Sequence, residues 1–98
     1  QAVERDEEDV DAHFSLGNAY LALDMPEAAL AYLKNARTLD PESSAVHVML
    51  ARTYLMLGRR AMARRMLRRA AALAGPDDRY AEEMADLRAA VDAGTSPA

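Results

Sequence analysis

The chain has 98 residues, enough for one domain at most, and 51% of them are hydrophobic, which is typical of a folded protein. Its formal net charge is −4 at pH 7, so no overall basic field draws it to nucleic acid or to a membrane surface. It contains no cysteine, which excludes disulfide bonds, thiol catalysis and thiolate metal sites and leaves both the cytoplasm and the periplasm open as compartments.

The first nine residues are acidic and precede the first periodic segment. Ala2–Asp6 resembles Ala36–Asp40, so we expect residues 1–9 to be the end of a preceding repeat or a segment that leads into the first helix. Asp9 or Asp11 is a candidate cap for that helix. The chain begins at Gln1 rather than Met, and we therefore expect it to be a piece of a longer protein.

Residues 10–43 predict a first pair of helices. Apolar residues at spacings of three and four predict a helix over Val10–Leu23, namely Ala12, Leu16, Ala19, Tyr20 and Leu23. Asp24–Glu27 breaks it, and Pro26 suits the first turn of a second helix over Pro26–Leu39. Asp40-Pro41 ends that helix because a residue before proline disfavours the α conformation.

Residues 44–76 predict a second pair. A helix over Ser44–Leu57 has Ser43 or Ser44 as its cap and Gly58 at its end. The next helix spans Arg60–Ala74 and ends at Gly75-Pro76.

Residues 77–92 predict a fifth helix that Asp77 or Asp78 caps. Its apolar stripe consists of Tyr80, Met84, Leu87 and Val91. Residues 93–98 are small and polar, and we expect them to form a disordered tail. No apolar run approaches the roughly 18 residues of a membrane span, so we expect no membrane insertion.

The two helix pairs repeat each other. Identical residues, most of them apolar and helically spaced, recur at one constant spacing, which we call the repeat interval: His13/His47, Leu16/Leu50, Tyr20/Tyr54, Leu21/Leu55, Leu23/Leu57, Ala29/Ala63, Leu33/Leu67, Ala36/Ala70 and Leu39/Leu73. Such recurrence is what a repeated packing interface needs. Small residues at Gly17, Ala51, Ala29 and Ala63 predict close approach between the helices of a pair.

The repeat interval and the residue types resemble the tetratricopeptide repeat, whose signature is aromatic-x₂-Leu-Gly-x₂-Tyr, then Ala-x₃-aromatic, then Ala and Pro. The first copy has His13, Leu16, Gly17, Tyr20, Ala29, Leu33, Ala36 and Pro41, and the second has His47, Leu50, Ala51, Tyr54, Ala63, Leu67, Ala70 and Pro76. The resemblance covers about residues 10–76. It implies an all-α fold, a right-handed α-solenoid of antiparallel helix hairpins with about five helices, in which residues 10–43 and 44–76 are the repeats and residues 77–92 are a capping helix.

The same resemblance implies a protein-interaction scaffold that binds a peptide or a partner helix in its concave groove. The groove residues implied are Phe14, Asn18, Leu21, Ala22, Val48, Arg52, Leu55 and Met56. Apolar pockets would take side chains of the partner, Asn18 its backbone, and Arg52 a carboxylate. Some family members clamp acidic C-terminal tails, but Phe14 and Met49 stand where such members have a lysine and a second asparagine, which argues against that activity.

Catalytic and metal-binding roles are not indicated. His13 and His47 occupy the same repeat position, about 10 Å apart by helix packing, so they cannot share a metal ion and are expected to pack. No nucleophile–base set and no phosphate-binding loop is present, and we expect no cofactor and no enzymatic activity.

Two further interpretations remain open. The arginines from Arg59 to Arg69 predict an exposed outer helix face. In the first interpretation, which we favour, some of these arginines form ion pairs with acidic residues of the fifth helix, namely Asp77, Asp78, Glu82, Glu83 or Asp86. In the second, they bind an acidic protein, an anionic membrane or nucleic acid. Two repeats also fall short of the roughly three that usually make a stable array. In this alternative, we expect the chain to be a structural segment of a larger multi-repeat protein, one to which a catalytic domain can be attached, and to self-associate as a homodimer.

Overall fold

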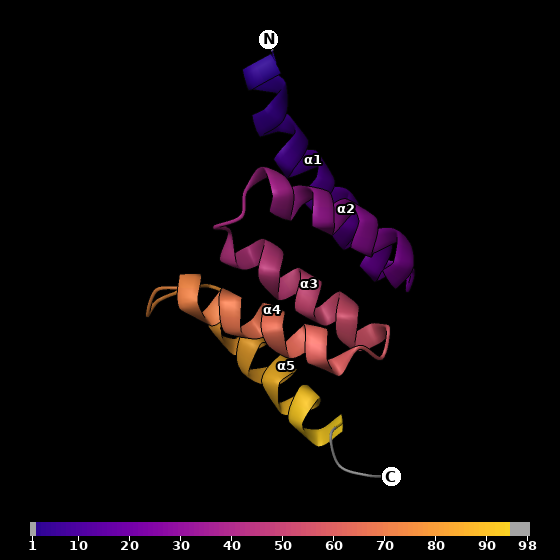
Figure 1. Ribbon diagram of the computed structural model, residues 1–98, viewed down its shortest axis with the longest axis vertical. Coiled ribbons are helices and arrows are strands. Elements are labelled where there is room, and N and C mark those ends of the chain that lie inside the picture. The colour runs from indigo at the N-terminus through magenta and orange to yellow at the C-terminus, as the bar shows by residue number, and fades with distance from the viewer. Residues whose placement is uncertain (1, 95–98) are drawn as a thin grey trace.

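The computed structural model describes the backbone of residues 2–94 and the side chains of residues 10–93. Within this range the chain forms five α-helices and no strand: α1 (Ala2–Ala22), α2 (Pro26–Leu39), α3 (Ser44–Met56), α4 (Arg60–Leu73) and α5 (Ala81–Gly94). Successive helices run antiparallel and stack from α1 to α5 along the long axis (Figure 1). Each packs on its sequence neighbours, and α3 also contacts α1 and α5. The predicted all-α solenoid of helix hairpins is confirmed.

The helix boundaries follow the sequence pattern in the middle of the chain and depart from it at the ends. Helix α2 has the predicted bounds, and α3 and α4 end one residue earlier than predicted. Helix α1 begins at Ala2 rather than Val10, so Asp9 and Asp11 lie inside it and the predicted cap is wrong.

Helix α5 also differs from the prediction at both ends. It begins at Ala81, and the N–H group of Tyr80 donates to Oδ1 of Asp78 at 2.8 Å in the turn before it. It continues through Ala93 and Gly94, two residues predicted to belong to a disordered tail; residues 95–98 of that tail lie outside the described residues.

Helix α3 ends in the hydrogen-bonded turn that a left-handed residue makes possible. Gly58 has a φ of 78°, and its N–H group donates to the carbonyl of Leu55 at 3.0 Å. The next N–H group, of Arg59, donates to the carbonyl of Tyr54 at 2.8 Å. These two bonds are the Schellman motif, which occupies carbonyl groups that the end of a helix leaves without partners.

Helix α1 ends in the same motif without a glycine. Asp24 has a φ of 60°, its N–H group donates to Leu21 at 3.0 Å, and that of Met25 donates to Tyr20 at 2.8 Å. A left-handed conformation costs most L-residues roughly 1–2 kcal/mol, although aspartate tolerates it better than others. The carboxylate also lies at the negative end of the helix dipole. The hydrogen bonds of this turn therefore stabilise the end of α1, whereas the backbone conformation and the charge of Asp24 destabilise it.

The two helices of the first hairpin approach each other closely at Gly17. A Cβ atom added to Gly17 would lie 2.5 Å from Cγ of Leu33, a side chain that is fully buried. On either side of this contact, Tyr32 of α2 stacks on Tyr20, with ring centroids 5.5 Å apart, and lies 5.8 Å from the ring of His13. The repeat positions 13, 17 and 20 thus all face the second helix of their own hairpin.

The core centres on α3, which is enclosed on several sides. Val46–Ala51, Thr53 and Tyr54 are all buried, and the hydroxyl of Thr53 donates to the carbonyl of Met49 at 2.7 Å. The equivalent face of α1 is open: Leu50 is fully buried, whereas Leu16 is 41% exposed. The difference arises because α2 packs on α3, while no described helix packs on that face of α1.

His47 is a polar residue inside this core. Its Nδ1 atom lies 2.8 Å from the carbonyl oxygen of Ser43, which makes Nδ1 the protonated nitrogen of a neutral ring. Burial lowers the pKa of His47, and the nearby cations of Arg37 and Arg69 lower it further; the hydrogen bond to Ser43 and the charge of Asp40 oppose this. The predicted packing role is what the structure gives this residue.

The helix-ending turns predict opposite effects for two exchanges. Replacement of Asp24 by glycine should raise the free energy of unfolding by about 0.5–1 kcal/mol, because it removes the left-handed strain and the misplaced charge. Replacement of Gly58 by alanine should lower it by about 1 kcal/mol through the same strain, since nothing lies within 4 Å of the added Cβ. Urea unfolding followed by circular dichroism measures both.

Gly75→Ala is the matched control, because Gly75 has neither a positive φ nor a close neighbour. An equal loss in Gly58→Ala and Gly75→Ala would contradict the assignment.

The lowered pKa of His47 predicts a loss of stability in mild acid. The unfolded chain takes up a proton as the pH falls through about 6.5, whereas the folded chain does so only at lower pH. The unfolded state therefore binds more protons in that interval, and the free energy of unfolding should fall as the pH is lowered from about 7.5 to 5.5. In His47→Gln, which keeps a hydrogen-bond donor, this fall should be smaller. Urea midpoints at several pH values give the two slopes, and parallel slopes would exclude His47 as their cause.

Candidate functional site

A hollow of about 540 Å³ lies where α1, α3 and the turn before α5 meet. Its lining residues are Asn18, Leu21, Ala22, Met49, Arg52, Met56 and Tyr80. We call it the α1/α3 groove. It brings together five of the eight residues expected from the sequence, namely Asn18, Leu21, Ala22, Arg52 and Met56.

The other three expected residues lie elsewhere. Val48 is fully buried, and its inclusion is corrected here, because its side chain belongs to the hydrophobic core. Phe14 and Leu55 are half-buried and pack against the core. The helical wheel places all three near the groove, but it carries no information about how neighbouring layers cover a helix.

Two lining residues were missed by the sequence analysis. The sequence pattern marks Met49 only as the place of an absent asparagine and Tyr80 only as part of an apolar stripe on the fifth helix. One regularity of the sequence could have found both, since Asn18, Met49 and Tyr80 are evenly spaced along the chain. Their spacing is slightly shorter than the repeat interval, and it marks positions on successive layers that face the same hollow.

Asn18 is the polar residue best placed to bind a partner in this groove. Its Oδ1 atom is buried and has no hydrogen-bond partner among the described residues. A buried acceptor without a donor costs about 1–3 kcal/mol, which a donor from a bound chain would recover. The amide is held on a helix whose packing is fixed by the neighbouring Gly17. Asn18 therefore lines the groove with an acceptor that is held in place beside apolar side chains but is not itself exposed.

Arg52 is already engaged within the protein. Its Nη1 atom lies 3.3 Å from Oε2 of Glu83 on α5, and that oxygen has no hydrogen bond of good geometry. The Arg52 side chain is 51% exposed, so the pair contributes only about 0–1 kcal/mol. The carboxylate of Glu83 nevertheless offsets the positive charge of Arg52, which was expected to bind a carboxylate of the partner.

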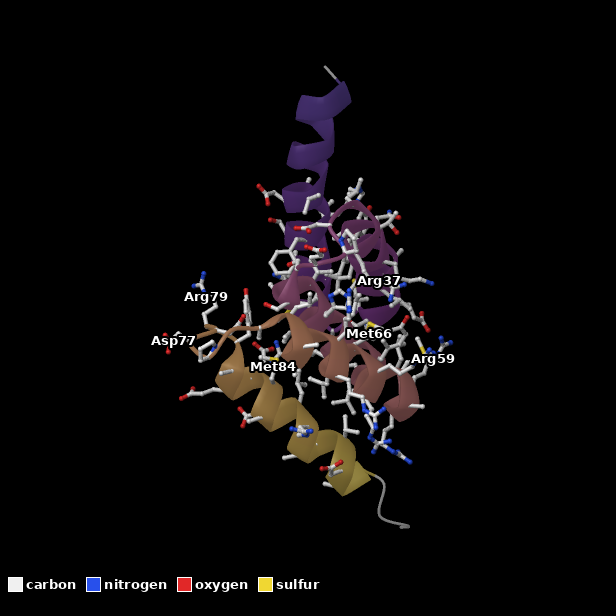
Figure 2. All side chains as sticks on the ribbon, turned by 60° about the vertical axis from the view of Figure 1, so that its left-hand side comes forward. Arg37, Arg59, Met66, Asp77, Arg79 and Met84 are labelled. Carbon is white, nitrogen blue, oxygen red and sulfur yellow. The ribbon has the colours of Figure 1, made fainter. Side chains whose placement is uncertain are left out.

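The arginines of α4 do not form the predicted pairs with the start of α5. Among the described side chains, their one ion pair joins Nη2 of Arg64 to Oδ1 of Asp92 at 3.8 Å, near the other end of α5. Asp78 instead accepts a hydrogen bond from Oγ of Ser44 at 2.9 Å. In Figure 2, Asp77 and Arg79 project from the turn that leads into α5, away from α4. Most of the α4 arginines thus face solvent.

Other classes of site find no support in the part of the chain that the structure describes. No group of three or more His, Cys, Asp or Glu side chains is arranged to hold a metal ion there. Among those same residues, no helix is both long and apolar enough to cross a membrane.

Comparison with known proteins agrees with the architecture. The family model for the tetratricopeptide repeat matches residues 21–90, from the end of α1 to the middle of α5. No curated protein matches the chain. Repeats of this family generally mediate protein–protein interactions and are typically non-catalytic. Because the match covers well over half of the sequence and the helices follow the repeat interval, the chain belongs to the tetratricopeptide repeat family.

Proposed function

We propose that this chain is a non-catalytic scaffold that holds a peptide or a partner helix in the α1/α3 groove. The observation that carries the proposal is the buried, unpartnered Oδ1 of Asn18 in a lining that also contains the apolar side chains of Leu21, Met49 and Met56. A peptide N–H group is the donor that such an acceptor lacks.

The groove favours a partner with apolar side chains over one recognised by its charge. Met49 and Met56 are flexible and polarizable, so they adapt to differently shaped side chains. Arg52 would bind a partner carboxylate only by giving up Glu83, and the exchange of one carboxylate for another gains little. We therefore assign the main energy of binding to apolar contacts and to Asn18, with Arg52 in a secondary role.

A peptide selected from a random displayed library against the wild-type chain tests this proposal. Its affinity should fall at least about tenfold, or about 1.4 kcal/mol, in an Asn18→Ala/Met56→Asp variant, which removes the acceptor and places a charge in the apolar lining. Isothermal titration measures the affinity. The control, Asn35→Ala/Ala61→Asp, makes related changes at exposed positions of α2 and α4 outside the groove. Equal affinities in the two variants would remove the groove from the function.

The second candidate function is self-association through α1. Leu16 and Leu23 are 41% and 66% exposed, although their equivalents in the second repeat, Leu50 and Leu57, are buried and half-buried. With Ala12 and Ala19, both exposed, they form an apolar stripe on one side of α1. Two copies that pair these stripes around a twofold axis would bury them in a symmetric dimer.

Leu16→Glu/Leu23→Glu should abolish such a dimer, because the two charges would face their counterparts across the twofold axis. Light scattering over a concentration series measures the mass. Both residues are exposed, so the folded monomer should lose little stability, which circular dichroism checks. A wild-type chain that remains monomeric at hundreds of micromolar would rule this function out.

A further inference from the structure

The α5 helix presents to solvent the positions that the other layers bury against a second helix. In α1 these positions are His13, Gly17 and Tyr20, which face Tyr32 and Leu33 of α2. In α3 they are His47, Ala51 and Tyr54, all buried. One repeat interval beyond α3, the same positions in α5 are Ala81, Ala85 and Arg88, all exposed.

A hollow of about 680 Å³ lies at this position, between α4 and α5, and we call it the α4/α5 groove. Apolar side chains of Leu67, Met84 and Val91 contribute to its lining. One repeat earlier, the equivalent space beside α2 and α3 is filled by α4 itself. There, Arg37 of α2 donates a hydrogen bond from Nη1 to Sδ of Met66 on α4 at 3.5 Å, and Figure 2 shows the two side chains next to each other. The groove therefore lies where the repeat would place one more helix.

The alanines of α5 suit the close approach of a helix. Ala81 and Ala85 occupy the positions of His13 and Gly17, and Gly17 allows close contact with Leu33 in the first hairpin. Small side chains one helical turn apart leave a shallow channel along α5 into which ridges of another helix fit. An extended peptide would match this helical spacing less well.

The charge of this groove is basic on one side. Arg64, Arg68 and Arg88 line it together with one acidic residue, Asp92. Of the three arginines, only Arg64 has an ion pair among the described side chains, at the long distance of 3.8 Å to Asp92, whose side chain is 69% exposed. Residues 43–76 contain no Asp or Glu, so α3 and α4 supply no carboxylate of their own. A partner with acidic side chains would complement the three guanidinium groups.

We propose that the α4/α5 groove is a docking site for an amphipathic helix of a partner protein, one whose stripe of alanine and leucine is flanked by glutamate or aspartate. The stripe would cover Leu67, Met84 and the alanines of α5, and the acidic flanks would pair with Arg64, Arg68 and Arg88. This site is separate from the α1/α3 groove and does not depend on it. The two could be occupied together because they share no lining residue.

A designed peptide provides the test. A labelled helical peptide of about 18 residues, with Ala and Leu on one stripe and Glu on its flanks, is titrated against the chain by fluorescence anisotropy, next to a peptide with Lys in place of Glu. The Glu peptide should bind at least about tenfold more tightly than the Lys peptide. Arg64→Glu/Arg68→Glu should weaken its binding about tenfold or more, and Ala85→Trp should abolish it by filling the groove.

Matched controls separate this site from general electrostatic attraction. Arg60→Glu/Arg65→Glu makes the same charge change on exposed residues of α4 outside the groove, and Asn18→Ala lies in the α1/α3 groove; both should leave the affinity unchanged. Equal losses in the two arginine pairs, equal binding of the Glu and Lys peptides, or no binding of either would overturn the proposal. Loss of a wild-type dimer in Arg64→Glu/Arg68→Glu, measured by light scattering, would assign the groove to a second copy of the chain instead.

Discussion

The close approach of two helices at a small residue sets the geometry of this molecule. Gly17 lies so near Leu33 that a single methyl group would collide with it, and in the second hairpin the same position holds a fully buried alanine. The hairpin spacing fixes how far each layer is displaced from the next, and hence which side chains of α1 and α3 border a common groove. Overpacking of such a contact costs about 1–3 kcal/mol. An alanine inside a helix stabilises it by only roughly 1 kcal/mol relative to glycine, so the packing at this position favours glycine despite its lower helix propensity.

The two grooves differ in the chemistry they offer. The α1/α3 groove contains one guanidinium group that Glu83 already neutralises, together with an unpartnered amide oxygen. The α4/α5 groove has three arginines and one weak internal pair. A stack of nearly identical hairpins thus produces two unlike surfaces, because residues that vary between repeats decide the polarity of each layer while the repeated residues hold the layers together.

How far a pattern predicts structure depends on whether its cause is local. The bounds of α2 follow from Pro26 and Pro41, whose effect acts within a residue or two. The repeat interval aligns Asp24 with Gly58, but an aspartate does not by itself indicate a left-handed residue, so the matching turn became evident only from its φ and its hydrogen bonds. Val48 and Tyr80 show the same limit in the site, because their exposure is decided by contacts between layers.

The sequence by itself determined the class of fold, the repeat interval and the helical phase, because a recurring segment of this length with apolar positions three and four apart is typical of stacked helix pairs. It also identified five residues that border the α1/α3 groove. Only the tertiary structure decided which copy of each repeated residue is buried by a neighbouring helix. It also decided that Arg52 forms an ion pair with Glu83 and that Ala81, Ala85 and Arg88 face solvent. Burial and ion pairing depend on the neighbouring layer, and a position in the repeat does not specify whether that layer is present.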